Sequence, residues 1–386
     1  MNDLLIRRAR LMEGTETVDV AIKDGYIADA GPAVAGSARQ MIDAAGRLLI
    51  PAFVDAHVHL DTALVLPEGE IGSPEEASED LNRRSQQFTK DDYLERGRLL
   101  LQKALRHATM VMRTQVSVDV DRGLQAVEAA LHLKEEFSGK VDLQVIVSAN
   151  GTAKPEQKIR ELLAEALSLG VDGLGGAPYQ SAEMQAWVDL IFALASKHDL
   201  FIELQAEDTD EPEVAFLDYI AAKATQYNYQ GKVVVTHCAG LAAVDEETAA
   251  RTINALSEAG ISVIIMPSAF LYCRGCNDNG LAHRGVTRVR ELQAAGVNVA
   301  CASDHIRDAF RPFGNADMLE ESLISAQVLQ MGTPLELHNV LRMYTYNAAA
   351  AIGLDKYGTA TGDRAELVLL DASNPQEAII GQAEKV

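Results

Sequence analysis

The feature that most constrains this chain is a regular alternation of short apolar runs with longer amphipathic stretches, from residue 48 to about residue 305. This order is typical of parallel strands, because parallel neighbours need a long crossover connection. The predicted strands are 48–57, 109–118, 141–148, 171–175, 200–204, 232–236, 261–266 and 297–302. The predicted helices include 94–107, 123–136, 156–169, 182–196, 212–227 and 245–259. Eight such units predict a (β/α)8 TIM barrel, although a doubly wound sheet has similar local patterns.

Both ends of the chain show a different pattern, in which short strands follow one another without helices. Strands are predicted at 4–11, 18–22 and 360–371, with turns at Asp24-Gly25 and Gly362-Asp363. We therefore expect the two ends to form one small β module, made of 1–49 and 355–386, beside a barrel domain of 50–354. Its expected role is that of a scaffold.

Composition narrows the class of protein and its partners. The 386 residues, 48% of them hydrophobic, are enough for one large core and a smaller module. The chain has 34 Lys and Arg against 56 Asp and Glu, and this net charge of -22 repels nucleic acid. No apolar run approaches the ~18 residues of a membrane span, and four cysteines are too few for a disulfide scaffold. We expect a soluble cytoplasmic protein without a membrane or nucleic-acid partner; a homo-oligomer stays open.

The first predicted barrel strand ends in two histidines, His57 and His59. Alternate side chains of a strand share a face, so both imidazoles would point the same way from a rigid strand end. That arrangement lets two imidazoles bind one metal ion. A single His-x-His pattern occurs easily by accident, so its interpretation depends on whether further ligands are present.

Polar residues gather where the predicted strands end, which is where the active site of a parallel barrel lies. Each has an ordinary structural explanation, since His237 could be a core histidine and Asp304 the N-cap of a helix. Independent structural roles would not place so many ligand-type residues at the same end of successive strands. The residues concerned are His57, His59, Gln115, Asn150, Gln205, Asp208, His237, Asp304 and His305.

The motifs at these positions resemble one known family. They are His57-Val-His59-Leu-Asp61, Thr236-His237, the run 284–290, Ser303-Asp304 with Asp308 four residues later, and the run 312–318. Together they are similar to the cytosine deaminase branch of the amidohydrolase superfamily, over nearly the whole chain. The resemblance implies a metal-dependent hydrolase barrel with a split terminal β-sandwich.

The resemblance also implies roles for individual residues. His57, His59 and Asp304 match metal ligands, and His237 matches the histidine that polarises the attacking water. Asp208 falls where the family has a proton-shuttling carboxylate. Asn150 falls at a substrate-binding position, and the predicted substrate-binding set also contains Gln115, His305 and Phe310.

This chain departs from the family at two predicted site positions. The family has a metal-ligating histidine where this sequence has Gln205, whose amide oxygen is a poorer donor than imidazole. Gln205 nevertheless stays a candidate fourth ligand. Gln115 likewise stands where relatives often have histidine. Strand 171–175 ends without the lysine that bridges two metals in binuclear relatives, so we expect one metal ion.

Two further features bear on specificity. His305 stands where cytosine-specific relatives have a second aspartate, which argues against cytosine itself as the substrate. Cys273 and Cys276 have a spacing typical of redox or zinc sites, but no second cysteine pair accompanies them. A place in a substrate loop is the better interpretation of that motif.

We therefore expect a metal-dependent amidohydrolase or deaminase acting on an amino- or alkylamino-substituted nitrogen heterocycle, or on a cyclic amide. One divalent ion, zinc or iron, would lower the pKa of a bound water molecule to about 7. Asp304 and Asp208 would move protons, and His237 would orient the nucleophile. The alternative, motivated by Gln205, is a catalytically impaired relative that binds a heterocycle without hydrolysing it.

Overall fold

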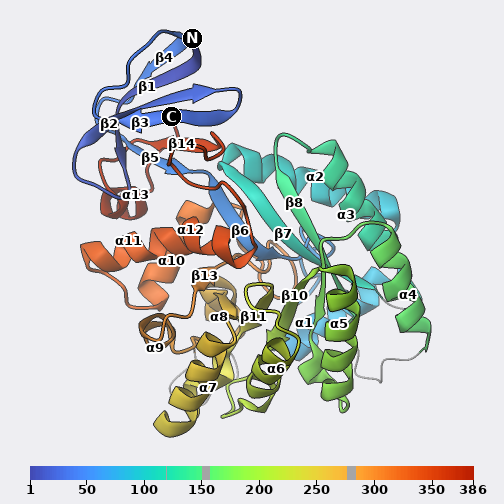
Figure 1. The fold of residues 1–386 in the computed structure, drawn as a ribbon. Coiled ribbons are helices and arrows are strands. Elements are labelled where there is room, and N and C mark those ends of the chain that lie inside the picture. Colours follow the sequence, from blue (N-terminus) through green and yellow to red (C-terminus); the bar gives the residue numbers. More distant parts are fainter. Residues whose placement is uncertain (119, 150–156, 276–283) are drawn as a thin grey trace.

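The computed structural model describes residues 1–118, 120–149, 157–275 and 284–386. Its larger part is a barrel of parallel strands with helices packed around the outside, and its smaller part is a separate sheet (Figure 1). Both chain termini lie at the smaller sheet, at the top left of Figure 1. The predicted combination of a (β/α)8 barrel with a β unit from both termini is confirmed.

Within the described ranges, eight strands form the barrel sheet in the order in which they occur in the chain. They are β6 (Phe53–Val58), β7 (Thr109–Val118), β8 (Asp142–Ala149), β9 (Gly173–Gly176), β10 (Phe201–Ala206), β11 (Val233–His237), β12 (Ser262–Ile265) and β13 (Val299–Cys301). Neighbouring strands pair in parallel, as the crossover pattern predicts. The first and last strands meet just beyond β13, where Val58 forms an isolated parallel bridge with Asp304.

The continuous strand predicted over 48–57 is wrong, because this segment forms two strands that belong to different sheets. β5 (Leu48–Pro51) pairs with strands of the smaller sheet, whereas β6 starts the barrel. Pro51 has no N–H to donate, and the next two amides bond in different directions. The Ala52 amide donates to the Glu366 carbonyl at 2.8 Å, and the Phe53 amide donates to the Ala108 carbonyl at 3.0 Å.

The helices follow the predicted positions to within a few residues. Some of them begin at a capping side chain, such as the Thr89 and Asp92 capping box at the start of α2. At Gly97 of α2, an added Cβ would lie 2.4 Å from the Leu133 side chain of α3, so a larger residue would require Leu133 to shift. The outer helices are α1 (Pro74–Ser85), α2 (Lys90–Arg106), α3 (Gln125–Glu136), α4 (Gln157–Ser168), α5 (Met184–His198), α6 (Ala215–Gln226), α7 (Glu246–Glu258) and α9 (Val289–Ala294).

Shorter and later helices complete the barrel. They are α8 (Pro267–Cys273), α10 (Met318–Val328), α11 (Pro334–Met343), α12 (Tyr346–Ala351), α13 (Pro375–Gly381) and the 3-10 turns 178–180 and 239–242. The main core lies between the barrel strands and these helices, and it is built from fully buried aliphatic and aromatic side chains such as Leu100, Phe192 and Val340. Burial of one such side chain stabilises the fold by about 1.5–3 kcal/mol.

The smaller sheet takes five of its strands from the first 51 residues and one from the C-terminal part. They are β1 (Asn2–Leu11), β2 (Thr17–Lys23), β3 (Tyr26–Gly31), β4 (Ala38–Asp43), β5 and β14 (Leu367–Leu370). The division into domains at 1–49 with 355–386 and at 50–354 stays a prediction. Among the described residues, no helix combines the length and apolar character needed to cross a membrane.

Candidate metal and active site

The closure of the barrel brings three predicted metal ligands together. The Asp304 amide donates to the His57 carbonyl at 2.9 Å, and the His59 amide donates to the Asp304 carbonyl at 3.0 Å. These backbone bonds place the side chains so that the possible ligand atoms of His57, His59 and Asp304 all lie within 4.8 Å of one another. Two segments far apart in the sequence therefore form one cluster.

Two atoms of this cluster lack normal hydrogen-bond partners among the described residues. They are His57 Nε2 and Asp304 Oδ1, which are both buried and lie 3.3 Å apart. His59 Nε2 lies 3.6 Å from the same Asp304 oxygen. Buried polar atoms without partners are costly, and tetrahedral zinc with bonds of ~2.0–2.1 Å separates its ligand atoms by about 3.3 Å. The donor set and its spacing fit a divalent cation.

Behind the cluster, a buried ionic network fixes the ring of His57. His57 Nδ1 lies 2.6 Å from Glu203 Oε1, and the other Glu203 oxygen lies 3.3 Å from Arg113 Nη1. Arg113 also donates to Gln144 Oε1 and to the Ile352 carbonyl. A carboxylate on the far nitrogen of a histidine fixes its tautomer and makes the near nitrogen a better metal ligand. Nε2 of His57 is thus the atom that faces the cluster.

The two strand-end histidines have opposite protonation tendencies. Burial disfavours a charged His57, but Asp304 and Glu203 outweigh burial and raise the pKa of His57 to about 10. Burial, helped by His305 and His57, lowers the pKa of His59 to about 4. The neighbouring histidines outweigh burial at Asp304 and hold the pKa of that carboxyl well below its usual range. The cluster thus favours positive charge beside Asp304, which a proton on His57 or a cation can supply.

His237 and Asp208 lie next to the cluster. The ring centroids of His237 and His57 are 6.1 Å apart, and burial lowers the pKa of His237 to about 3. His237 Nδ1 lies 2.7 Å from the Thr236 hydroxyl, while Nε2 lies 3.9 Å from Asp208 Oδ2. The structure therefore brings His237 and Asp208, two of the three residues that the sequence predicts as catalytic, to within 3.9 Å of each other.

Gln205 also reaches the cluster, from β10. Its Nε2 lies 3.5 Å from His59 Nε2 and donates to Gln115 Oε1 at 3.0 Å. Gln115 in turn donates from its own Nε2 to the Glu203 carbonyl at 3.1 Å. The two glutamines at positions where the resemblance predicts histidine are therefore hydrogen-bonded to each other.

His305 and Phe310 lie on the other side of His59. The His305 ring stacks on His59, with centroids 4.9 Å apart, and on Phe310, with centroids 4.5 Å apart. His305 Nδ1 lies 2.6 Å from Asp308 Oδ2. Burial disfavours a charged His305, but Asp304 and Asp308 outweigh it and raise its pKa. Of the predicted substrate-binding residues, Asn150 lies outside the described residues, as does Cys276.

The sequence analysis missed several residues of the site. Glu203 and Arg113 lie inside apolar strands, and a charged residue within such a run is the signal that could have revealed them. Arg274 and Tyr179 carried no such signal, because they come from separate connections. Arg274 forms an ion pair with Asp208, and the Tyr179 hydroxyl donates to Asp208 Oδ2 at 2.9 Å. The cysteine motif thus contributes its arginine to the site.

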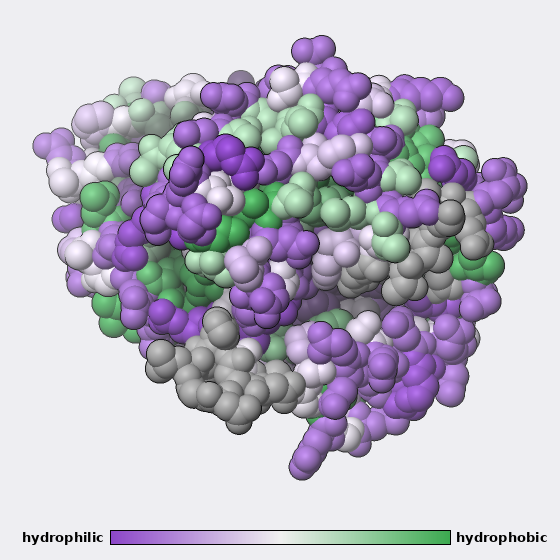
Figure 2. All heavy atoms as spheres, turned by 90° about the horizontal axis from the view of Figure 1, so that it is seen from below, coloured by the Kyte–Doolittle hydropathy of each residue, from purple (hydrophilic) through white to green (hydrophobic). Residues whose placement is uncertain are grey.

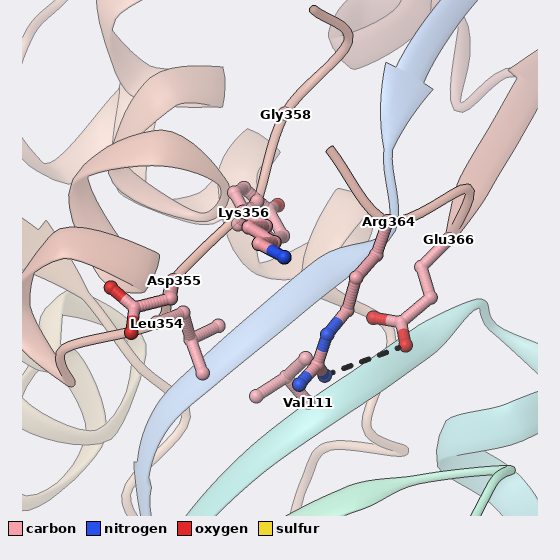
Figure 3. Close-up of a pocket in the computed structure, with 8 residues that line it drawn as sticks. Val111, Leu354, Asp355, Lys356, Gly358, Arg364 and Glu366 are labelled. Carbon is pink, nitrogen blue, oxygen red and sulfur yellow. Dashed lines mark ion pairs between the residues drawn. The ribbon is translucent and has the colours of Figure 1, made fainter. Parts of the chain in front are cut away.

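The two ends of the barrel differ in their surface. After β5 of the smaller sheet, the chain enters the barrel as β6, which runs toward the lower side of Figure 1. Figure 2 shows that side as mainly hydrophilic and hollowed near its centre. At the opposite end, a cavity of about 10 Å³ lies beside Val111, near the start of β7 (Figure 3). Arg364 and Glu366 form an ion pair of 3.8 Å there. That volume holds about one water molecule, so this cavity is no substrate site.

The comparisons with known proteins agree with this geometry. The model of the amidohydrolase family matches residues 113–380. The chain belongs to the amidohydrolase family, and its fold and site define a hydrolase that acts on carbon–nitrogen bonds other than peptide bonds. The predicted resemblance is confirmed.

Individual relatives cover nearly the whole chain. The N-isopropylammelide isopropyl amidohydrolase of Pseudomonas sp. (strain ADP) is 30% identical, over 100% of this chain and 94% of the relative. The pterin deaminase of Rhizobium rhizogenes (strain K84 / ATCC BAA-868) is 29% identical, over 93% of this chain and 83% of the relative. The solved 5-methylcytosine deaminase from Klebsiella pneumoniae, liganded with 5-fluorocytosine, has a TM-score of 0.92 and 30% identity, over 99% of this chain and 95% of that one.

Proposed function

We propose that this chain uses one divalent ion, zinc or iron, to hydrolyse the bond between a nitrogen heterocycle and its amino or alkylamino substituent, or a related cyclic amide. The observation that carries the proposal is a pair of buried atoms without normal partners among the described residues, His57 Nε2 and Asp304 Oδ1, at the end of a barrel whose relatives act on such rings. A cation held between them would satisfy both atoms.

His57, His59 and Asp304 are the residues that would hold the ion. When bound, such an ion lowers the pKa of a water molecule enough to supply a nucleophile near neutral pH. The Glu203 carboxylate keeps the His57 ring in place, since it lies 2.6 Å from Nδ1. Asp304 is the proposed acceptor for a proton of the attacking water; its lowered pKa keeps the carboxylate ionised in the ion-free protein, although it also makes the group a weaker base.

His237 and Asp208 would move and orient protons on the other side of the cluster. His237 is neutral because its pKa is about 3, and Thr236 engages Nδ1, so Nε2 is the nitrogen that faces Asp208. Arg274 and Tyr179 hold the Asp208 carboxylate in position. We expect Asp208 to deliver a proton to the ring nitrogen or to the leaving amine.

His305, Phe310, Gln115 and Asn150 are proposed to select the substrate. Both faces of the His305 ring are covered, by His59 and by Phe310, so His305 meets a substrate through its edge. Its Nδ1 lies 2.6 Å from Asp308 Oδ2, and its Nε2 lies 3.6 Å from Asp304 Oδ1, so the free edge of the ring borders the ligand cluster.

The deciding experiment measures bound metal per chain together with release of ammonia or alkylamine from a panel of aminotriazines, aminopyrimidines and aminopteridines. We expect about one ion per chain and turnover of at least one compound. A bound ion without turnover of any compound in the panel would favour the binding protein instead. Absence of both would contradict the proposed function.

A matched variant separates proton transfer from ion binding. Asp208→Ala is expected to lower turnover about 100-fold or more while the metal content stays that of the unmodified protein. Equal loss of metal and of activity would make Asp208 a ligand. A cytoplasmic location, the absence of a nucleic-acid partner and the oligomeric state stay predictions.

A further inference from the structure

The orientation of the Gln205 amide is decided by a chain of hydrogen bonds. The chain starts at the Glu203 carbonyl, a main-chain oxygen that only accepts, and Gln115 Nε2 donates to it at 3.1 Å. Gln115 must therefore turn its own oxygen toward Gln205. That oxygen also only accepts, so Gln205 must present its nitrogen, and the Oε1 to Nε2 distance is 3.0 Å.

Reversal of either amide is unfavourable. If Gln205 alone turned over, its oxygen would lie opposite Gln115 Oε1, and two acceptors would face each other. If both turned over, Gln115 Oε1 would face the Glu203 carbonyl in the same way. Gln115 is fully buried and Gln205 is 8% exposed, so water cannot easily relieve either contact. The Glu203 carbonyl thus determines that Gln205 donates to Gln115 and not the reverse.

This orientation determines which atom of Gln205 lies at the metal site. Gln205 Nε2 lies 3.5 Å from His59 Nε2, a spacing close to the distance of about 3.3 Å between neighbouring ligands of a tetrahedral zinc ion. The Gln205 atom beside His59 Nε2 is thus an amide nitrogen, whose N–H groups cannot donate an electron pair to a cation. An amide oxygen in the same place could have done so.

We infer that Gln115 fixes Gln205 as a hydrogen-bond donor at the metal site, so that Gln205 is not a ligand and His57, His59 and Asp304 alone hold the ion. The free N–H of Gln205 then donates to an oxygen or ring nitrogen beside the ion. This inference rests on the proposed function, because it concerns the same ion. It replaces the predicted fourth ligand and makes Gln115 a positioning residue.

The test measures zinc affinity by competition with a chromophoric chelator. Gln205→Leu removes the amide and keeps the size of the side chain, and its Kd for Zn²⁺ is expected to stay within about threefold of the unmodified protein. Asp304→Asn is the matched control that replaces the carboxylate ligand by a neutral amide, and it is expected to weaken binding at least about tenfold. Weakening in Gln205→Leu equal to that in Asp304→Asn would show that Gln205 is a ligand and overturn the inference.

A second variant tests the positioning role of Gln115. Gln115→Met keeps the shape but frees the Gln205 amide to turn its oxygen to the ion, so the Kd should fall about threefold or more. The double variant Gln115→Met with Gln205→Leu should lose that gain, which a merely structural effect of Gln115 would not do. An unchanged or higher Kd in Gln115→Met would overturn the proposed direction of the hydrogen bond from Gln205 to Gln115. Circular dichroism confirms that each variant is folded.

These outcomes are separate from those of the proposed function. A protein that binds zinc with the expected pattern of affinities but hydrolyses nothing would remove the proposed activity and leave this inference in place. A protein that binds no ion would overturn both.

Discussion

Two fully buried arginine–glutamate pairs of this molecule end in different ways. Arg113 and Glu203 lead to His57 Nε2, an atom without a normal partner within the described residues. In the second pair, Arg311 Nη2 donates to Glu321 Oε1 at 2.8 Å, and the Ser268 hydroxyl donates to the other Glu321 oxygen. We call the first network open, because it ends in an atom without a normal partner among the described residues. We call the second closed, because its groups bond to one another within the protein.

The difference teaches how function can be recognised among buried charges. A closed network satisfies its groups within the protein and so contributes to conformational specificity, whereas an open one keeps an atom available for a ligand. Asp55 lies between the two, because its pKa responds to both Glu321 and His57. The predictions below test whether the two networks are separate in function.

The largest expected effect is on folding and comes from the closed network. Glu321→Gln leaves Arg311 buried and charged without its carboxylate, and breaking such a pair costs about 3–5 kcal/mol of the free energy of unfolding. Metal content per folded chain should not change. Urea unfolding and metal analysis measure the two quantities, with Glu320→Gln on the same helix as control. Loss of metal in Glu321→Gln would show that the two networks are one.

Asp55 links the networks and should make stability depend on pH. Burial raises the pKa of Asp55 to about 7, against 3.8 in the unfolded chain, so the folded state binds the extra proton between these values. The stabilisation is complete below pH 3.8 and is lost as pH rises to about 7, by at most about 4 kcal/mol. In metal-free protein, the free energy of unfolding should therefore decrease between pH 4.5 and 7.5 by more in the unmodified chain than in Asp55→Asn. Parallel pH curves would rule this out.

The open network should be most sensitive at its ligand carboxylate. Asp304 has a backbone φ of 63°, which asparagine tolerates, so Asp304→Asn is expected to fold. It should lose turnover about 100-fold or more, because the ligand and the proton acceptor are both removed. His57→Ala and His59→Ala should lose metal. Activity within a few-fold of the unmodified protein would refute the role of Asp304.

Glu203→Gln tests the link between the arginine and the metal site. Loss of a carboxylate that orients a ligand histidine typically weakens metal binding by about 10–100-fold. Glu203→Gln should therefore weaken zinc binding, unlike Glu321→Gln, when both are compared at equal folded fractions. Equal metal affinity in the two variants would remove the distinction between open and closed networks.

The smallest expected effect concerns the position where a family histidine is missing. Gln205→His supplies an imidazole nitrogen, a better donor than an amide, and should tighten zinc retention against a chelator by about threefold or more. Turnover is not the criterion, because a stronger ligand also makes the ion a weaker Lewis acid. Metal analysis after chelation and desalting is the measurement. Weaker retention would mean that position 205 does not face the ion.

Much of the fold could be predicted because the positions of its strands and helices follow from the local periodicity of apolar residues. The apolar alternation gave eight strands and their helices, and the His57 and His59 pair followed from the two-residue repeat of one strand. The break at Pro51 escaped this reasoning, because 48–54 is apolar throughout and either sheet could bury it. Which sheet pairs with each half depends on the distant Glu366 and Ala108 carbonyls.

The candidate site divides in the same way. The sequence by itself determined the residue types at the strand ends, because strand direction in a parallel barrel places them on one side. Only the tertiary structure decided that Asp304 bridges His57 and His59, that Arg274 pairs with Asp208, and that the Gln205 amide points its nitrogen inward. The physical reason is that partner choice and amide direction depend on atoms from other strands, which no local pattern encodes.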